Sequence, residues 1–216
     1  MFNTNIVIFF PTFLECRKVL NISDFSSYFY FDTAVYKSIP IIITGAGKSN
    51  AAAHSALFFS EFKPKYPLLT GICGAYQNTG IKISDVVCID YDYFADEANY
   101  NGNILTTIHE KGFIIAKDNR AEFQVDENFK KVSSNTVSLI PQFNSLSNIY
   151  MAKTNALVEN MEGAAFGIAA NKFGIKPYQI RAVSNYCGNI EKQQWDINNA
   201  CVSLKKAVDL FIETHK

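Results

Sequence analysis

Two stretches decide the fold, Val158-Glu159-Asn160-Met161-Glu162-Gly163-Ala164-Ala165-Phe166 and, further along the chain, Arg181-Ala182-Val183-Ser184-Asn185. Apolar residues 156–158 and 178–183 predict two buried strands, each ending in a polar corner. A helix rich in small residues is expected between them, from Gly163 to Gly174, a residue typical of the position after a helix. The two strand ends therefore place Glu159, Glu162 and Asn185 at one edge of a sheet, where open α/β folds keep their sites.

Other strand ends carry similar residues. Apolar runs at 5–10, 39–43 and 67–70 predict strands. They are followed by a short helix from Phe13 that contains Glu15, by a glycine loop at 44–50, and by the glycine-bearing residues 71–74. This pattern predicts one α/β domain over residues 1–216, a three-layer α/β/α sandwich around a mixed sheet with a single composite site.

The rest of the chain is expected to alternate between loops and short elements. A helix is predicted from Ala51 to about Phe62, capped by Asn50, and a fourth strand at 85–89. Residues 91–103 read as a long loop or lid, 136–139 as a short strand, 141–148 as loop and 186–194 as a polar, mobile segment. A final amphipathic helix is expected from about Ile197.

Gly47-Lys48-Ser49 resembles part of a phosphate loop. The full G-x-x-x-x-G-K-[ST] frame requires a glycine at position 42, which is Ile42. A nucleoside-triphosphate site is therefore excluded, and Gly45 and Gly47 are expected to let the backbone approach a smaller ligand closely.

Composition narrows the function classes. The 216 residues are 48% hydrophobic, with 20 basic and 20 acidic residues and no basic run, which argues against disorder and against a nucleic-acid partner. The five cysteines form no C-x-x-C pair and the three histidines have no ligand spacing, so neither disulfides nor a metal site are expected. No stretch reaches the roughly 18–20 apolar residues of a membrane helix. We expect a cytoplasmic protein that needs no cofactor.

The motifs resemble the nucleoside phosphorylase and nucleosidase superfamily. They occur in the family's order: Thr44-Gly-Ala-Gly-Lys, Thr70-Gly-Ile-Cys-Gly-Ala, Asp85-Val-Val, the block from Val158 and the block from Arg181. Within that superfamily, the Glu-Asn-Met-Glu-Gly-Ala-Ala-Phe block, Ser-Asn-Tyr at 184–186 and Gln194-Trp195 look most like the futalosine hydrolases. Those enzymes release hypoxanthine from a nucleoside-like precursor in menaquinone biosynthesis.

The resemblance implies roles for the matched positions. Glu162 would bind the ribose hydroxyls, Met161 would lie against the ribose, and Glu15 would activate water at the anomeric carbon. Asn185 takes the place of an aspartate that handles the purine in adenine-cleaving nucleosidases. By position alone, Glu162 is also consistent with a solvated first-turn glutamate and Glu15 with an ordinary residue of a helix face.

Further candidates for substrate binding come from the same loops and strand ends: Gly45, Gly47, Cys73, Gly74, Asn160 and Ser184. Phe143 is a candidate for stacking on the purine, with a plain loop anchor as the alternative. Lys48, Arg120 and Lys153 are candidates for the carboxylate-bearing arm of the substrate. The resemblance also implies a homodimer or higher homo-oligomer.

Two departures from the family pattern bear on substrate and nucleophile. An asparagine amide at 185 both donates and accepts, which favours a 6-oxopurine over adenine. Hexameric purine phosphorylases carry a phosphate-binding arginine where this chain has Leu69, so water is the favoured nucleophile. The alternatives left open are a methylthioadenosine/S-adenosylhomocysteine nucleosidase, a phosphorylase, and a nucleoside-binding protein without turnover, for which Glu15 would be superfluous.

Overall fold

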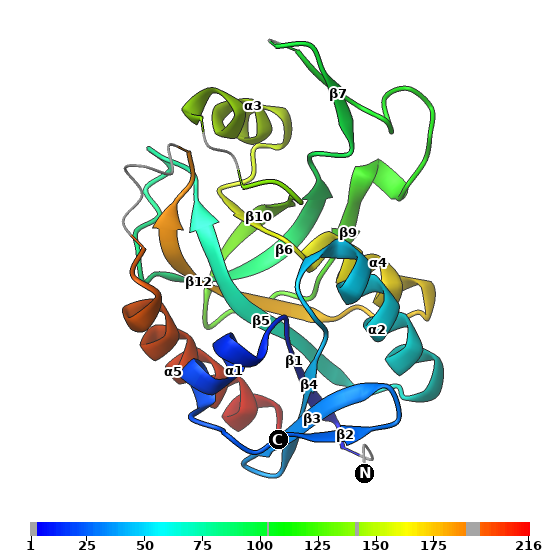
Figure 1. The fold of residues 1–216 in the computed structure, drawn as a ribbon, viewed down its shortest axis with the longest axis vertical. Coiled ribbons are helices and arrows are strands. Elements are labelled where there is room, and N and C mark those ends of the chain that lie inside the picture. Colours follow the sequence, from blue (N-terminus) through cyan, green and yellow to red (C-terminus); the bar gives the residue numbers. More distant parts are fainter. Residues whose placement is uncertain (1–3, 103, 141–142, 189–194) are drawn as a thin grey trace.

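The computed structural model describes residues 4–102, 104–140, 143–188 and 195–216. Its centre is a ten-stranded mixed sheet in the order β11-β10-β6-β12-β5-β1-β4-β3-β2, with β9 paired to β6 (Figure 1). The strands of this sheet are β1 Ile6–Phe10, β2 Ser26–Tyr28, β3 Phe31–Tyr36, β4 Ile39–Ile43, β5 Tyr66–Ala75, β6 Val86–Phe94, β9 Arg120–Glu122, β10 Lys130–Thr136, β11 Val158–Asn160 and β12 Tyr178–Tyr186. Strands β4, β1, β5 and β12 run parallel, so their carboxyl ends meet at one edge.

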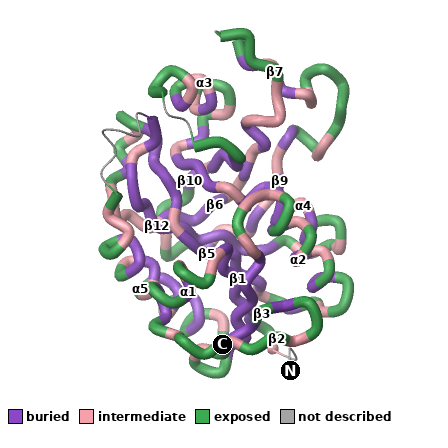
Figure 2. The backbone as a smooth tube through the Cα atoms, viewed as in Figure 1, coloured by how far each residue is buried: buried purple, intermediate pink, exposed green. Residues whose placement is uncertain are grey.

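Helices cover both faces of the sheet. Helices α1 (Phe13–Leu20) and α5 (Ile197–His215) lie on one face, and α2 (Gly47–Glu61) and α4 (Gly163–Lys172) on the other (Figure 1). The buried strand β1 shows why both layers are needed. Its alternate side chains Ile6, Ile8 and Phe10 belong to the core under α5, whereas Val7 and Phe9 belong to the core under α2 and α4. Figure 2 shows that the central strands form a buried layer between the two helical layers.

Helix α4 lies close to the sheet because its residues are small. Its one large core residue, Phe166, packs edge-on against Phe9 at 5.0 Å and Phe59 at 5.6 Å between ring centroids. A side chain at Gly167 would meet Phe123 at 2.7 Å. This close packing fixes the start of α4 at the carboxyl edge of the sheet, next to the end of β11.

Most predicted elements are confirmed, and several boundaries are corrected. Strand β5 continues through the glycines to Ala75, and β6 continues to Phe94, so much of the expected loops is strand. Helix α2 begins at Gly47 rather than at Ala51, and Asn50 lies inside it, donating to the carbonyl of Ala46. Of the expected strand at 136–139, only Thr136 is strand, as the last residue of β10, and residues 137–139 lie beyond it.

Several elements were not predicted at all, among them strands β2, β3 and β9 and most of β10. Helix α3 (Asn144–Thr154) occupies part of the expected loop, and a hairpin of β7 (Ala98–Tyr100) and β8 (Leu105–Thr107) projects from the body of the protein (Figure 1). Residues 189–194 of the expected mobile segment lie outside the described residues. Within the described part of the chain, no helix combines the length and apolarity needed to cross a membrane.

Candidate active site

A cavity of about 270 Å³ opens at the carboxyl edge of the parallel strands. Its lining comes from the start of α1, the N-cap of α2, β5, the segment after β10, the β11–α4 corner, the end of β12 and the residue before the N-cap of α5. These residues are Thr12, Leu14, Glu15, Ala46, Ile72, Cys73, Gly74, Val137, Ile140, Glu159, Asn160, Met161, Glu162, Ser184, Asn185 and Trp195. Segments far apart in the sequence thus form one composite site.

Glu15 is held in a fixed orientation at one side of the cavity. Thr12 caps helix α1 by accepting from the Glu15 amide, and its hydroxyl donates to Oε2 at 2.6 Å. The backbone amide of Ile72 donates to Oε1 at 3.0 Å. The pKa of Glu15 is raised, chiefly by burial and also by Glu162, while both hydrogen bonds and the charge of Arg181 oppose the rise. A fixed carboxylate with a raised pKa suits a general base.

Glu162 lies opposite, in a buried ion pair. Its Oε1 accepts from the backbone amide of Gly47 at 3.1 Å, and its Oε2 lies 3.3 Å from Arg181. The Arg181 guanidinium is 1% exposed and also donates to Asn160 Oδ1 and to the carbonyl of Ile72. Each carboxylate oxygen keeps a second lone pair for a ligand hydroxyl.

A buried network of polar side chains holds the residues between β11 and α4 in place. Asn160 Oδ1 accepts from the amide of Gly163 at 2.7 Å, and its Nδ2 donates to Asp92 Oδ2 at 2.7 Å. Asp92 also accepts from Gln179 and Thr136. Burial raises the pKa of Asp92 to about 6 despite these donors. The network orients Asn160, which in turn positions the first turn of α4 and the Arg181 side chain.

Position 71 must be glycine because it lies between the side chains of Glu15 and Arg181. A Cβ there would lie 2.8 Å from Glu15 Oε1 and 2.9 Å from Arg181 Nη1. Any side chain would therefore displace both charged groups, which explains glycine in the middle of a buried strand.

The other end of the cavity is nearly free of charge. Ser184 donates to Asn185 Oδ1 at 2.8 Å, and Asn185 Nδ2 donates to the carbonyl of Tyr186 at 3.2 Å, which orients the amide. Gly74 pairs with Asn185 across β5 and β12, and a Cβ at Gly74 would lie 2.7 Å from Cys187 Sγ. Burial raises the pKa of Cys73 to about 12, so this residue lines the cavity as a neutral thiol and not as a nucleophile.

The family model of the phosphorylase superfamily matches residues 17–213. The chain belongs to the phosphorylase superfamily. The family expected from the sequence motifs, and the α/β/α fold expected with it, are confirmed.

Two relatives with assigned names represent two kinds of enzyme. The futalosine hydrolase of Thermus thermophilus is 28% identical over 179 residues, 76% of this chain and 77% of the relative. The 5'-methylthioadenosine/S-adenosylhomocysteine nucleosidase of Staphylococcus aureus is 24% identical over 218 residues, 91% of this chain and 92% of the relative.

Solved structures of both groups share the fold. A futalosine hydrolase mutant from Helicobacter pylori superposes with a TM-score of 0.76 at 17% identity, covering 97% of this chain and 98% of that one. The 5'-methylthioadenosine/S-adenosylhomocysteine nucleosidase of the same organism, with butyl-thio-DADMe-Immucillin-A, superposes with a TM-score of 0.78 at 16% identity, covering 99% and 100%.

Most site residues predicted from the phosphorylase superfamily resemblance meet at the cavity. Those that line it are Glu15, Cys73, Gly74, Asn160, Met161, Glu162, Ser184 and Asn185. Gly47 contributes its backbone amide to Glu162 without lining the cavity. Gly45 lies behind, against the Asn50 side chain. Phe143 is 71% exposed at the start of α3 and does not line the cavity, so the structure does not bring it to the other site residues.

The cations considered for the substrate arm are all engaged elsewhere. Lys48 lies 2.5 Å from Asp96, and Lys153 lies 2.5 Å from Glu110. Arg120 stacks over Tyr91 at 3.7 Å. None of the three lines the cavity. Among the described residues, no group of three or more His, Cys, Asp or Glu side chains could hold a metal ion.

Sequence reasoning missed several contributors to the site. The motif that begins at Arg181 assigns this residue no role of its own, yet it is the buried partner of Glu162. Thr12 belongs to none of the motifs, yet it caps α1 and orients Glu15. Asp92 was placed in a loop, and Trp195 was noted only for the family resemblance. The usable signal was the scarcity of arginine: a single arginine inside an apolar strand requires a carboxylate partner.

Proposed function

We propose that this chain is a purine nucleosidase that hydrolyses the N-glycosidic bond of futalosine, releasing hypoxanthine and dehypoxanthine futalosine, a step of menaquinone biosynthesis. The observation that carries the proposal is the pairing of Glu15 and Glu162 across one cavity, with an amide at Asn185 at its other end. Resemblance of the motifs to the futalosine hydrolases and the Thermus relative support the choice of substrate.

The chemistry follows from the positions of the two carboxylates. Water attacks the anomeric carbon as the bond to the purine breaks, and Glu15 accepts its proton. Glu162 accepts hydrogen bonds from the ribose hydroxyls through its remaining lone pairs and stabilises the positive charge that develops on the sugar. Arg181 holds Glu162 in place through their buried ion pair.

Water is favoured over phosphate as the nucleophile. Phosphate recognition favours a cation with several donors. Leu69, where phosphorylases carry an arginine, is a fully buried core residue. Among the described lining residues there is no arginine or lysine, and the guanidinium of Arg181 is already committed to Glu162, Asn160 and Ile72.

A second candidate is a 5'-methylthioadenosine/S-adenosylhomocysteine nucleosidase. The Staphylococcus relative favours it, since that match covers more of the chain than the Thermus match does. Asn185 argues against it, because adenine presents an exocyclic amine and gains from an acid at this position. A homodimeric, cytoplasmic enzyme acting without a cofactor remains a prediction from the sequence.

Competition between substrates tests the proposal. Purified protein is incubated with futalosine, 5'-methylthioadenosine, S-adenosylhomocysteine and inosine separately, and kcat/KM is measured while the released base is identified chromatographically. We expect hypoxanthine from futalosine with the highest kcat/KM. Adenine released from 5'-methylthioadenosine with a higher kcat/KM would favour the second candidate instead. The Glu15→Gln protein, prepared in parallel, controls for contaminating nucleosidases.

A further inference from the structure

The proposed reaction lacks a proton donor for the departing base. A purine leaves more readily when it is protonated as the glycosidic bond breaks. Asn185 can donate a hydrogen bond but has no titratable proton to transfer. Three carboxyl groups line the cavity in the part of the chain that the structure describes, and Glu15 and Glu162 already have roles at the sugar. The third is Glu159.

Glu159 lies beside Asn185 at the base end. It is a β11 residue paired with Gly74 of β5, and Asn185 of β12 pairs with the same glycine from the other side. A Cβ at Gly74 would lie 2.7 Å from Cys187 Sγ, 3.4 Å from Asn185 Nδ2 and 3.6 Å from Glu159 Cγ. The side chains of Glu159 and Asn185 therefore both lie next to Gly74, on either side of this strand.

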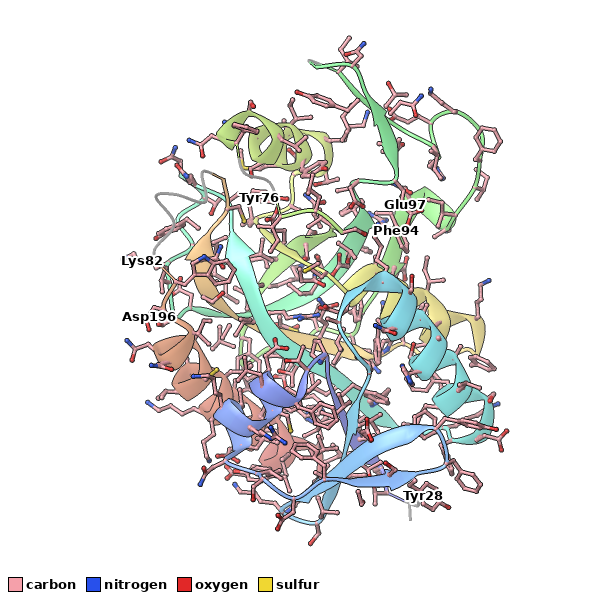
Figure 3. All side chains as sticks on the ribbon, in the orientation of Figure 1. Tyr28, Tyr76, Lys82, Phe94, Glu97 and Asp196 are labelled. Carbon is pink, nitrogen blue, oxygen red and sulfur yellow. The ribbon has the colours of Figure 1, made fainter. Side chains whose placement is uncertain are left out.

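The hydrogen bonding of Glu159 is incomplete. The residue is 6% exposed, and its Oε2 is buried without a hydrogen-bond partner. Burying a carboxylate oxygen without a hydrogen bond costs free energy, so binding of a ligand that forms a hydrogen bond with Oε2 would be favoured. Tyr76, which directly follows β5 and is labelled in Figure 3, is hydrogen-bonded to Glu159. Its hydroxyl accepts from Asn135 at 2.9 Å, which leaves its own proton to donate to Glu159.

The surroundings of Glu159 raise its pKa to near neutrality. Burial and, to a lesser degree, the charge of Asp96 raise the pKa to about 7, although hydrogen bonds from Tyr76 and Cys187 oppose the rise. The other titratable groups facing it are the thiol of Cys73 and the hydroxyl of Tyr150, both neutral because burial raises the pKa of each to about 12. A carboxyl that titrates near the working pH is suited to proton transfer.

We infer that Glu159 is the general acid that protonates the departing purine, next to Asn185. This inference rests on the proposed nucleosidase function. As the bond between C1' and the base nitrogen breaks, its electron pair stays with the base, and the Glu159 proton moves to a ring nitrogen or the 6-oxygen. Water forms the new C1'–O bond and loses its proton to Glu15. The two carboxyls then exchange one proton with solvent, so that Glu15 is again ionised and Glu159 again protonated.

The pH dependence of the unmodified enzyme tests this directly. With the purine nucleoside that the enzyme cleaves fastest, kcat/KM should fall as pH rises through about 7, because the acid loses its proton. With 4-nitrophenyl β-D-ribofuranoside, whose phenolate leaves without a proton, this alkaline fall should be absent. A kcat/KM for the purine nucleoside that stays constant up to pH 9 would overturn the assignment, whether or not any variant folds.

The Glu159→Gln variant adds a second readout. It should lower kcat for the purine nucleoside by roughly 10²–10⁴, abolish the alkaline fall, and change kcat for the nitrophenyl riboside less than about tenfold. Glu122→Gln, at a half-exposed glutamate on β9, is the matched control and should behave as the parent. Equal losses on both substrates, or an unchanged pH profile, would assign Glu159 a structural role. A parent enzyme that releases no base from any purine nucleoside would instead refute the proposed function itself.

Discussion

The two ends of the cavity differ in their electrostatic surroundings. At the sugar end, the carboxyl groups of Glu15 and Glu162 are held by the backbone amides of Ile72 and Gly47 and by the buried Arg181. At the base end, Asn185 is uncharged, and the carboxyl of Glu159 has no cation beside it among the described residues. The difference matches the charges of the proposed reaction: positive charge develops on the ribose, where fixed carboxylates stabilise it, and negative charge develops on the base, where donors are needed.

The largest effect should come from the sugar end. Glu15→Gln keeps the shape of the side chain and removes its ability to accept a proton, so kcat should fall by roughly 10²–10⁴ with a small change in KM. Steady-state kinetics on the substrate identified above provides the measurement. Glu61→Gln, at an exposed glutamate ending α2, is the control. Near-parental turnover in the Glu15 variant would remove this residue from the mechanism.

Removing the cation should destabilise the sugar end itself. Arg181→Met leaves Glu162 buried without its partner, which typically costs about 3–5 kcal/mol of the free energy of unfolding. Urea denaturation measures this loss. Arg17→Met, at an exposed arginine that packs over Phe13 and Phe25, should cost at most about 1 kcal/mol. If both variants lost the same small amount, Arg181 would not be the electrostatic support of the site.

The pH dependence of stability should expose the network behind the site. The pKa of Asp92 rises from 3.8 to about 6 on folding, so the folded state binds its proton more tightly than the unfolded state does. Its favourable contribution is therefore complete below pH 3.8 and is lost as pH rises through 6, by about 3 kcal/mol in total. Asp92→Asn, which cannot ionise, should gain stability relative to the parent between pH 4 and 7.5. A constant difference between the two proteins would contradict the raised pKa.

The smallest effect concerns the base end. Asn185→Asp should shift the ratio of kcat/KM for futalosine over its adenine-bearing analogue toward the analogue. A buried polar mismatch of about 1–3 kcal/mol corresponds to roughly a tenfold to hundredfold change in that ratio. If the ratio does not move in this direction, Asn185 does not read the 6-position of the base.

Local sequence patterns predicted the strand ends and helix starts that build the site. Continuous apolar runs such as that of β4 permit only a strand covered on both faces, and Gly163 with the alanines after it predicts the closely packed helix α4. Helix α3 was missed because only Ser147 and Tyr150 are buried in it, so its sequence shows no apolar face.

Partners far apart in the sequence could not be predicted in the same way. Asp92 contacts Asn160 across 68 residues and Gln179 across 87, and nothing in its local sequence marks it as buried. The continuation of β5 through Gly71 and Gly74 was missed because glycines normally end strands. Here they make room for Glu15, Arg181 and Cys187, which only the folded chain brings together.

Dependence on phosphate tests the central claim most directly, namely that the paired carboxylates serve an attack by water. Base release is followed in phosphate-free buffer and again with added phosphate, and the sugar product is identified by mass spectrometry. The arrangement of Glu15 and Glu162, with Leu69 buried in the core, predicts equal rates in both buffers and a free reducing sugar as the product. An absolute requirement for phosphate, with a sugar 1-phosphate as the product, would contradict it.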